Sequence, residues 1–241
     1  MAGPLWLRVR APFAAFRWMQ AGVYRATSPV MPPSTAWGLV LNLAGVETRE
    51  PVSHAEGATT LVRPDAPRLR LAIGAVREPE RASLYQQLHG YPVGSSGKDG
   101  LQPRARGSKF WIAPARREVL VGLDLMLGVE AEDAALLGRV VDGLHGRLPG
   151  GRYGLPFAGD NNFLFDRLDV LPAPEPARWY EAMGADEGPR RGACRLTVGI
   201  DRADASRTRT ALYAPAAAPR AEPSDAAWTW VPSAPPGAEG G

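Results

Sequence analysis

The chain has 241 residues, a formal net charge of +3 and a single cysteine, Cys194. One cysteine excludes a disulfide framework and a cysteine-based zinc site, and it fits a reducing cytosol. The N-terminal segment lacks the apolar region of a signal peptide because Arg8 and Arg10 interrupt it, and no apolar run is long enough to span a bilayer. We therefore expect a soluble, cytoplasmic globular protein without a membrane partner.

The first strand is predicted at Leu5–Arg10, where apolar and polar side chains alternate. Trp6, Arg8 and Arg10 share one face of this strand. An aromatic ring and two arginines on an open sheet face suit base stacking and phosphate contact. An edge strand whose charged side chains prevent pairing with another chain explains the same pattern equally well.

A helix is predicted at Thr35–Ala44, with Ser34 as its N-cap and Gly45 as a left-handed terminator. The helix is apolar on almost every side, which predicts that it is buried. Its N-terminus offers free amide groups, hydroxyls and the positive end of the helix dipole, which suit a phosphate. The candidate ligands there are Ser34, Thr35, Arg17 and Arg25. An ordinary capped core helix is the alternative.

The next predicted elements are a polar loop with a short strand at Thr59–Val62, a strand at Leu69–Val76 and a short helix at Leu84–Leu88. Residues 98–117 then carry six basic residues and one acid. The basic residues are Lys98, Arg104, Arg106, Lys109, Arg116 and Arg117. Glycines predict a projecting loop at residues 94–107, and strands at 110–112 and 119–121 return to the core. Such a basic hairpin is typical of a nucleic-acid finger, and a solvated surface loop is the alternative.

An amphipathic helix is predicted at Glu130–Arg147, followed by a glycine loop and a strand at Phe163–Leu168. Clustered glycines let a backbone approach a ligand closely. The candidate residues of this loop are Gly150, Gly151, Arg152 and Tyr153. From Pro172 a linker leads to a small C-terminal unit, whose strands are predicted at Cys194–Asp201, Thr208–Tyr213 and Trp228–Val231. Residues 232–241 are predicted to be a disordered tail.

Several chemistries are excluded by spacing. Gly97-Lys98 lacks the first glycine and the hydroxyl residue of a phosphate-binding P-loop, and the glycine loop lacks dinucleotide-binding spacing. No histidine has a metal-ligating neighbour, so neither a metal nor another cofactor is expected. A metal-independent ribonuclease remains as an enzymatic alternative, with His89, Tyr91 and Lys98 as the base and the phosphate-binding groups.

Four motifs resemble the CRISPR-associated family five proteins, which hold the 5′ end of the guide RNA in type I Cascade. The first combines Phe16-Arg17 and Ser28-Pro29 with the PPST run at residues 32–35 and Gly38. The others resemble the subtype labelled MYXAN: YQQLHGYPVG at residues 85–94, RREVL at 116–120 and YGLPFAGDNNF at 153–163. The resemblance covers about residues 5–170.

The resemblance implies an α+β fold with a ferredoxin-like (RRM-type) domain over residues 1–171. A β-hairpin thumb would project at residues 91–109, and residues 172–231 would form the small β-rich unit. It implies a largely non-catalytic subunit that caps the 5′ handle of the crRNA and bridges the backbone and large subunits, reaching target DNA only through the complex. Trp37 joins the handle-binding residues at the helix N-terminus. A scaffold that contacts only proteins is the further alternative.

Overall fold

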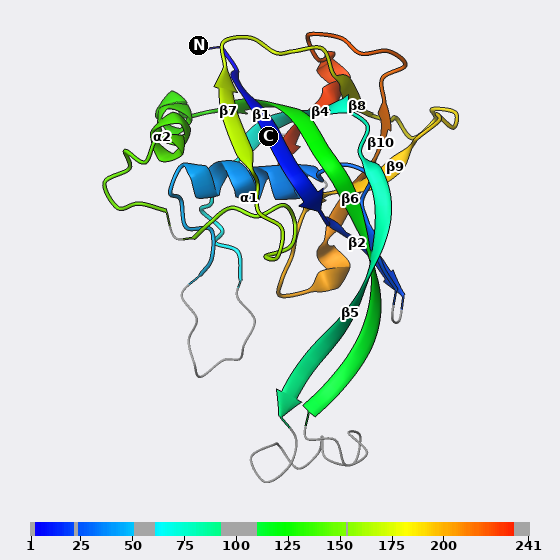
Figure 1. Cartoon of the computed structure of the whole chain (residues 1–241). Coiled ribbons are helices and arrows are strands. Elements are labelled where there is room, and N and C mark those ends of the chain that lie inside the picture. Colours follow the sequence, from blue (N-terminus) through cyan, green and yellow to red (C-terminus); the bar gives the residue numbers. More distant parts are fainter. Residues whose placement is uncertain (1–2, 22–23, 51–60, 93–109, 153, 234–241) are drawn as a thin grey trace.

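The computed structural model describes residues 3–21, 24–50, 61–92, 110–152 and 154–233 (Figure 1). The fold is α+β and is built mainly from strands. Its strands are β1 (Leu5–Ala14), β2 (Arg17–Ala21), β3 (Tyr24–Thr27), β4 (Leu69–Arg77), β5 (Glu80–Pro92), β6 (Phe110–Ala131), β7 (Arg167–Leu171), β8 (Arg178–Ala182), β9 (Cys194–Gly199), β10 (Arg209–Pro215) and β11 (Trp228–Val231). Its helices are α1 (Pro33–Leu43), α2 (Ala134–Leu144) and the short 3-10 turns η2 (Ala205–Arg207) and η3 (Asp225–Ala227).

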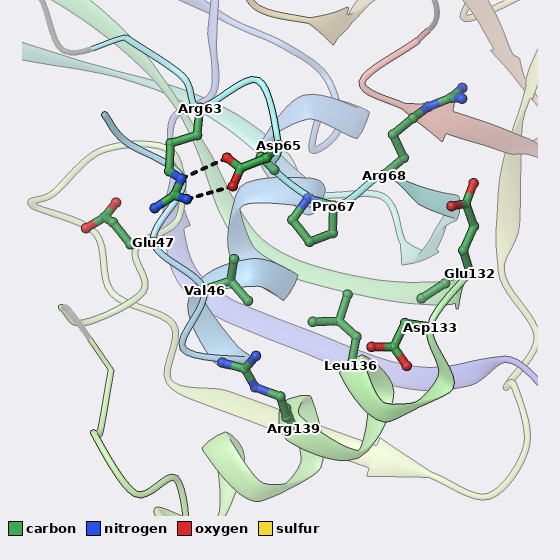
Figure 2. Close-up of a pocket in the computed structure, with 12 residues that line it drawn as sticks. Val46, Glu47, Arg63, Asp65, Pro67, Arg68, Glu132, Asp133, Leu136 and Arg139 are labelled. Carbon is green, nitrogen blue, oxygen red and sulfur yellow. Dashed lines mark hydrogen bonds and ion pairs between the residues drawn. The ribbon is translucent and has the colours of Figure 1, made fainter. Parts of the chain in front are cut away.

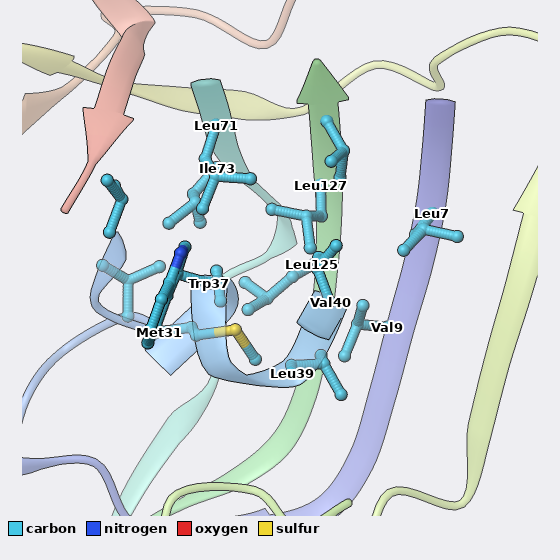
Figure 3. Packing of buried hydrophobic residues seen from close by; sticks show 14 of the residues in the cluster. Leu7, Val9, Met31, Trp37, Leu39, Val40, Leu71, Ile73, Leu125 and Leu127 are labelled. Atoms are coloured by element: carbon cyan, nitrogen blue, oxygen red, sulfur yellow. The ribbon is translucent and has the colours of Figure 1, made fainter. Parts of the chain in front are cut away.

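The central sheet has the strand order β7-β1-β6-β4, and every neighbouring pair in it is antiparallel. The chain enters these four strands and the two helices in the order β1-α1-β4-β6-α2-β7. Figure 3 shows apolar side chains of α1 packed between those of β1, β4 and β6. Close packing of α2 on α1 needs Gly143, because a Cβ there would lie 1.7 Å from the carbonyl oxygen of Leu43. Both helices therefore cover one face of the sheet.

The opposite face of this sheet is covered by the C-terminal part of the chain. Trp6 packs against Trp179 and Trp228, with ring centroids 6.0 and 5.9 Å apart. Gly128 makes this possible, since a Cβ there would lie 2.6 Å from the ring of Trp6 and 2.8 Å from that of Trp228. The open face that Leu5–Arg10 was predicted to offer is absent from the described structure, because distant aromatic residues fill it.

The two arginines of β1 are also engaged in ion pairs. The guanidinium of Arg8 donates to both carboxylate oxygens of Asp124, at 2.9 and 2.8 Å, and to Glu175 at 2.7 Å. Arg10 pairs with Asp169 at 2.9 Å. Burial raises the pKa of Asp169, but hydrogen bonds from Arg167 and Arg10 outweigh this and hold that pKa below its usual value. These arginines therefore stabilise the covered face.

The C-terminal strands extend the sheet. β8 and β11 both pair with β4, and β10 links β8 to β9. Cys194, Leu196 and Val198 of β9 lie in the same apolar core as α1. The strands predicted at Cys194–Asp201, Thr208–Tyr213 and Trp228–Val231 are confirmed with small shifts of their ends, while the division of the chain into two domains at residue 171 stays a prediction.

Four element predictions are corrected by the structure. Leu84–Leu88, predicted as a helix, lies in strand β5, and the two short strands predicted at 110–112 and 119–121 are parts of the single strand β6. The helix predicted at Glu130–Arg147 is shorter in the structure, because residues 130–131 are the end of β6. Asp133 is the N-cap of α2, and its carboxylate accepts a hydrogen bond from Ala135 N–H at 2.9 Å. The strand predicted at Phe163–Leu168 begins only at Arg167.

Other predictions lie partly or wholly outside the described residues. Of the short strand at Thr59–Val62, only Val62 is described as bridged, to Arg49. The tip of the hairpin at residues 93–109 and the tail at 234–241 are not described. Within the described part of the chain, no helix is long and apolar enough to span a membrane.

Candidate nucleic-acid interface at the base of the β5–β6 hairpin

The longest strand, β6, joins the core to a two-stranded arm. Its C-terminal half pairs with β1 and β4, and its N-terminal half pairs with β5 from Val121 to Phe110. Gly122, with φ +71°, separates the two halves, and this left-handed conformation favours glycine. Figure 1 shows β5 and β6 extending together away from the helices. The predicted thumb therefore begins well before residue 91, at Glu80.

An ion pair anchors the base of this arm. Arg117 of β6 pairs with Asp160, and each side chain is only 14% exposed. The same carboxylate accepts hydrogen bonds from the backbone N–H and the side-chain amide of Asn162, at 2.9 and 2.7 Å. A nearly buried charge pair of this kind is strongly constrained, because removing one partner leaves the other unpaired. It ties the loop after α2 to the hairpin.

A second set of contacts ties the same place to β1 and β3. Glu118 accepts a hydrogen bond from Thr27 N–H at 3.0 Å, and the hydroxyl of Thr27 accepts one from Phe16 N–H at 2.9 Å. Gly159 lies so close that a Cβ there would be 2.4 Å from the carbonyl oxygen of Ala15. Residues of three of the four sequence motifs thus meet at one junction, which holds the hairpin in place.

One row of exposed side chains crosses this junction. Arg116 of β6 is the register partner of Tyr24 on β3 and of Tyr85 on β5. Register partners point to the same face of a sheet, with Cβ atoms about 5 Å apart. Tyr24 is 39% exposed, Tyr85 is 74% exposed, and Arg116 is also exposed. We call Tyr24, Arg116 and Tyr85 the platform.

Arg116 forms no ion pair with any residue that the structure describes, whereas its neighbour Arg117 does. A guanidinium between two aromatic rings can bind a phosphate while the rings stack on bases. Arg116 and Arg117 were predicted together as RNA ligands. The structure separates them into an exposed cation and an anchor of the junction.

The N-terminus of α1, where a phosphate site was predicted, has several of its groups bonded or buried within the chain, and phosphate binding there stays a prediction. Pro32, rather than Ser34, is the N-cap residue, and Ser34 makes no side-chain capping bond. The N–H groups of Thr35 and Ala36 already donate to Pro32, at 2.9 and 3.0 Å. Ser34 is 8% exposed, and Trp37 is 9% exposed with its Nε1–H donating to Pro67 at 2.8 Å. These residues belong to the core.

The glycine loop lies at the other end of α1. Gly154 accepts a hydrogen bond from the side chain of Asn42 at 3.3 Å, and the backbone of Gly151 approaches Gly45. The eleven residues of α1 separate its two ends by roughly 15 Å. Gly150, Gly151 and Arg152 are exposed, and Tyr153 lies outside the described residues. The structure therefore does not bring the two predicted sites together.

The remaining candidates have different surroundings. Arg17 is exposed on β2, and Arg25 of β3 is half-buried as the register partner of Arg117. The backbones of His89 and Tyr91 lie in β5, but their side chains are not among those described. The predictions outside the described residues are Lys98, Arg104, Arg106 and Lys109. Within the described residues, no group of His, Cys, Asp or Glu is arranged to hold a metal ion.

A pocket lies elsewhere, between the loop after α1 and the start of α2 (Figure 2). Its volume is about 440 Å³. Arg63 and Asp65 pair with each other on its wall at 2.7 Å, and Glu47 pairs with Arg49. None of the predicted site residues lines it. Its lining carries the acids Glu47, Asp65, Glu132 and Asp133 beside the bases Arg63, Arg68 and Arg139, so for an anionic strand the platform is the better candidate interface.

Sequence reasoning missed Tyr24, and it included Tyr85 only as part of a motif. Each is separated from Arg116 by a long stretch of sequence, so only the pairing of β3, β5 and β6 brings them together. An alternating pattern in residues 80–86 was the available signal for Tyr85. Tyr24 had none of its own.

Comparison with known proteins gives a consistent result. The family model Cas5d, described as a CRISPR-associated protein (Cas_Cas5), matches residues 5–198. A chain of a CRISPR RNA-guided surveillance complex is 15% identical with a TM-score of 0.56, over 90% of this chain and 91% of that chain. A structure titled "Crystal structure of Cas protein" is 16% identical with a TM-score of 0.49, over 90% and 95% of the two chains. No curated protein matches the sequence.

Proposed function

The chain belongs to the CRISPR-associated Cas5 family, and from this premise we propose that it binds and caps the 5′ handle of the crRNA in a type I Cascade complex. The platform at the base of the β5–β6 hairpin is the observation that carries this proposal. It offers, between two exposed tyrosines, an arginine that forms no ion pair with the described residues. Those are the groups with which proteins hold single-stranded RNA without reading every base.

The proposed assignment of the fold to a ferredoxin-like (RRM-type) domain supports this function. The order β1-α1-β4-β6-α2-β7 and the sheet order β7-β1-β6-β4 fit a ferredoxin-like (RRM-type) domain. An RRM stacks bases on the open face of its sheet. In this chain Trp6, Arg8 and Arg10 of that face contact other parts of the protein. The proposed RNA contact is therefore moved to the hairpin base.

The hairpin tip and the glycine loop complete the proposed path of the handle. The basic residues predicted at the tip would contact successive phosphates beyond the platform. Arg152 and Tyr153 of the glycine loop remain proposed contacts to a different part of the RNA or to a neighbouring subunit. We propose that the chain joins the backbone and large subunits, acts in the cytoplasm and meets target DNA only through the complex.

The test mixes the purified chain with labelled precursor crRNA in a chelator, measuring binding and running a denaturing gel on the same samples. We expect binding without cleavage, and about tenfold weaker binding for Arg116→Glu. Arg220→Glu is the charge-matched control, because Arg220 is exposed, forms no ion pair with the described residues and lies outside the platform. Equal affinity of Arg116→Glu and the wild type would refute the platform.

The same gel distinguishes the ribonuclease alternative. Cleavage of the precursor at one position, lost in His89→Ala, would show that the chain processes its own guide RNA and would replace the non-catalytic role. An intact precursor in the presence of bound protein supports the capping role.

A further inference from the structure

The outer face of the β9–β10 hairpin is rich in arginine and threonine. Leu196 and Val198 of β9 point into the core, so Arg195 and Thr197 point outward. Their register partners on β10 are Leu212 and Thr210, which are also exposed. The guanidinium of Arg209 lies over Gly199, where a Cβ would be 3.1 Å away from it. We define the C-terminal face as Arg195, Thr197, Arg209, Thr210 and Leu212.

The charges of this face are not neutralised by the described part of the chain. Neither Arg195 nor Arg209 forms an ion pair with any described residue. The nearby acids are engaged locally. Asp201 accepts hydrogen bonds from the backbone N–H groups of Ala203 and Asp204, both at 2.9 Å. Asp204 in turn binds Ser206 at 2.6 Å and pairs with Arg207 at 3.3 Å. The face therefore keeps a positive charge and several hydroxyl groups.

The C-terminal face is joined to the hairpin base through β2. Trp18 of β2 donates a hydrogen bond from its indole N–H to the carbonyl oxygen of Arg195, at 3.1 Å, and its ring is 37% exposed. β2 pairs with β3 at Ala21 and Tyr24, and Tyr24 belongs to the platform. The pairing of β2 with β3 and the hydrogen bond of Trp18 thus connect the two surfaces.

We propose that the C-terminal face is a second contact surface for the RNA strand bound at the platform, and that it binds the sugar-phosphate backbone. This rests on the proposed function of the platform. Guanidinium groups and threonine hydroxyls donate to phosphate oxygens, and such contacts position a strand without reading its sequence. Trp18, between the two surfaces, offers a ring to an unpaired base. A protein partner would need a largely acidic surface to cover the same arginines.

The experiment measures the affinity of the full chain for two RNAs that share a 5′ end, one of about 8 and one of about 30 nucleotides. We expect the double variant Arg195→Glu, Arg209→Glu to bind the long RNA about tenfold more weakly and the short RNA unchanged. For the long RNA, the slope of the logarithm of the binding constant against the logarithm of the salt concentration should become shallower by about 1.4, because two phosphate contacts are lost. The control Arg220→Glu should match the wild type with both.

The outcomes separate the two proposals. If the double variant binds the long RNA like the wild type while Arg116→Glu binds both RNAs weakly, the C-terminal face is overturned and the platform stands. If Arg116→Glu leaves both affinities unchanged, the platform is refuted as an RNA contact. The proposal for the C-terminal face, which rests on it, is then refuted as well. The milder variant Arg195→Gln, Arg209→Gln covers the case in which two glutamates disturb folding, and it should show a smaller loss of the same sign. Unchanged long-RNA binding by this folded variant also overturns the C-terminal face.

Discussion

The N-terminal end of α1 is buried together with Pro32 and Pro33, whereas the base of the β5–β6 hairpin presents its side chains to solvent. Both regions combine hydroxyl-bearing, aromatic and basic residues, which lie within residues 17–37 at α1 but far apart along the chain at the hairpin base. In α1 the N–H groups of Thr35 and Ala36 bond to Pro32, and the ring of Trp37 joins the core. In the hairpin base Arg116 lies between two exposed rings.

The difference shows that residue type alone does not identify a ligand site. A helix N-terminus binds an anion only when its amide groups are free and reachable. Exposure distinguishes the platform from α1, and the lack of an ion partner among the described residues further distinguishes Arg116 from Arg117. We therefore expect changes near α1 to affect stability and changes at the platform to affect RNA affinity.

The largest expected effect is on stability, from Trp37→Ala. Removing a buried indole leaves a cavity and an unpaired carbonyl at Pro67, so the free energy of unfolding should fall by about 3–5 kcal/mol. Urea unfolding followed by tryptophan fluorescence measures it. A change below about 1 kcal/mol would show that the N-terminal end of α1 is not part of the core.

The next largest loss of stability is expected from breaking the ion pair at the junction. Asp160→Ala leaves Arg117 almost buried without a partner, so we expect a loss of about 2 kcal/mol in the free energy of unfolding. Asp160→Asn keeps the bonds to Asn162 possible and serves as the matched control. Thermal unfolding of the two variants compares them. Wild-type stability in Asp160→Ala would contradict the anchoring role.

Two capping residues sharpen the comparison between the helices. Asp133→Ala should lower the free energy of unfolding by about 1 kcal/mol, because its carboxylate caps α2. Ser34→Ala should change it by less than about 0.5 kcal/mol, since Ser34 makes no capping bond. Both variants are measured by urea unfolding. Equal losses in both would restore Ser34 as the cap of α1.

The smallest effect concerns pH on the covered face of the sheet. The pKa of Asp169 is lower in the folded chain than its ordinary value of 3.8. Its pairing therefore stabilises the fold above that pH, and the stabilisation is lost as the pH falls through the lowered pKa. Arg10→Gln should remove part of it, under about 1 kcal/mol at neutral pH, and the difference from the wild type should vanish in acid. A difference that persists in acid would show that Arg10 acts through packing.

The sequence predicts the local secondary structure of this fold and few of the strand pairings between distant parts of the chain. The two helices and the strands β1, β4 and β9–β11 follow from apolar periodicity. β5 does not, because ERASLYQQLHGYP has little β-propensity and becomes a strand only by pairing with β6. β2, β3 and β8 are short. β2 and β3 pair with each other, but the partners that place β3 and β8 in the sheet, β6 and β4, lie far along the chain.

For the candidate site too, local features can be predicted from the sequence, but long-range contacts cannot. The basic charge around Arg116 is visible in the sequence, but its burial and its neighbours depend on register. Nothing local indicates that Trp179 and Trp228 cover Trp6, or that Asp160 neutralises Arg117. Such pairings are set by contacts between residues far apart in the chain, which a single sequence does not reveal.

The most direct test of the central claim compares RNA affinity across salt concentrations for the wild type and for Tyr85→Ala, Arg116→Glu. We expect the double variant to unfold at the wild-type urea concentration, because both side chains are exposed, and to bind RNA at least about tenfold more weakly. Its affinity should also depend less steeply on salt, since one phosphate contact is lost. Wild-type affinity and an unchanged salt dependence in the folded double variant would contradict the platform as the RNA contact of this protein.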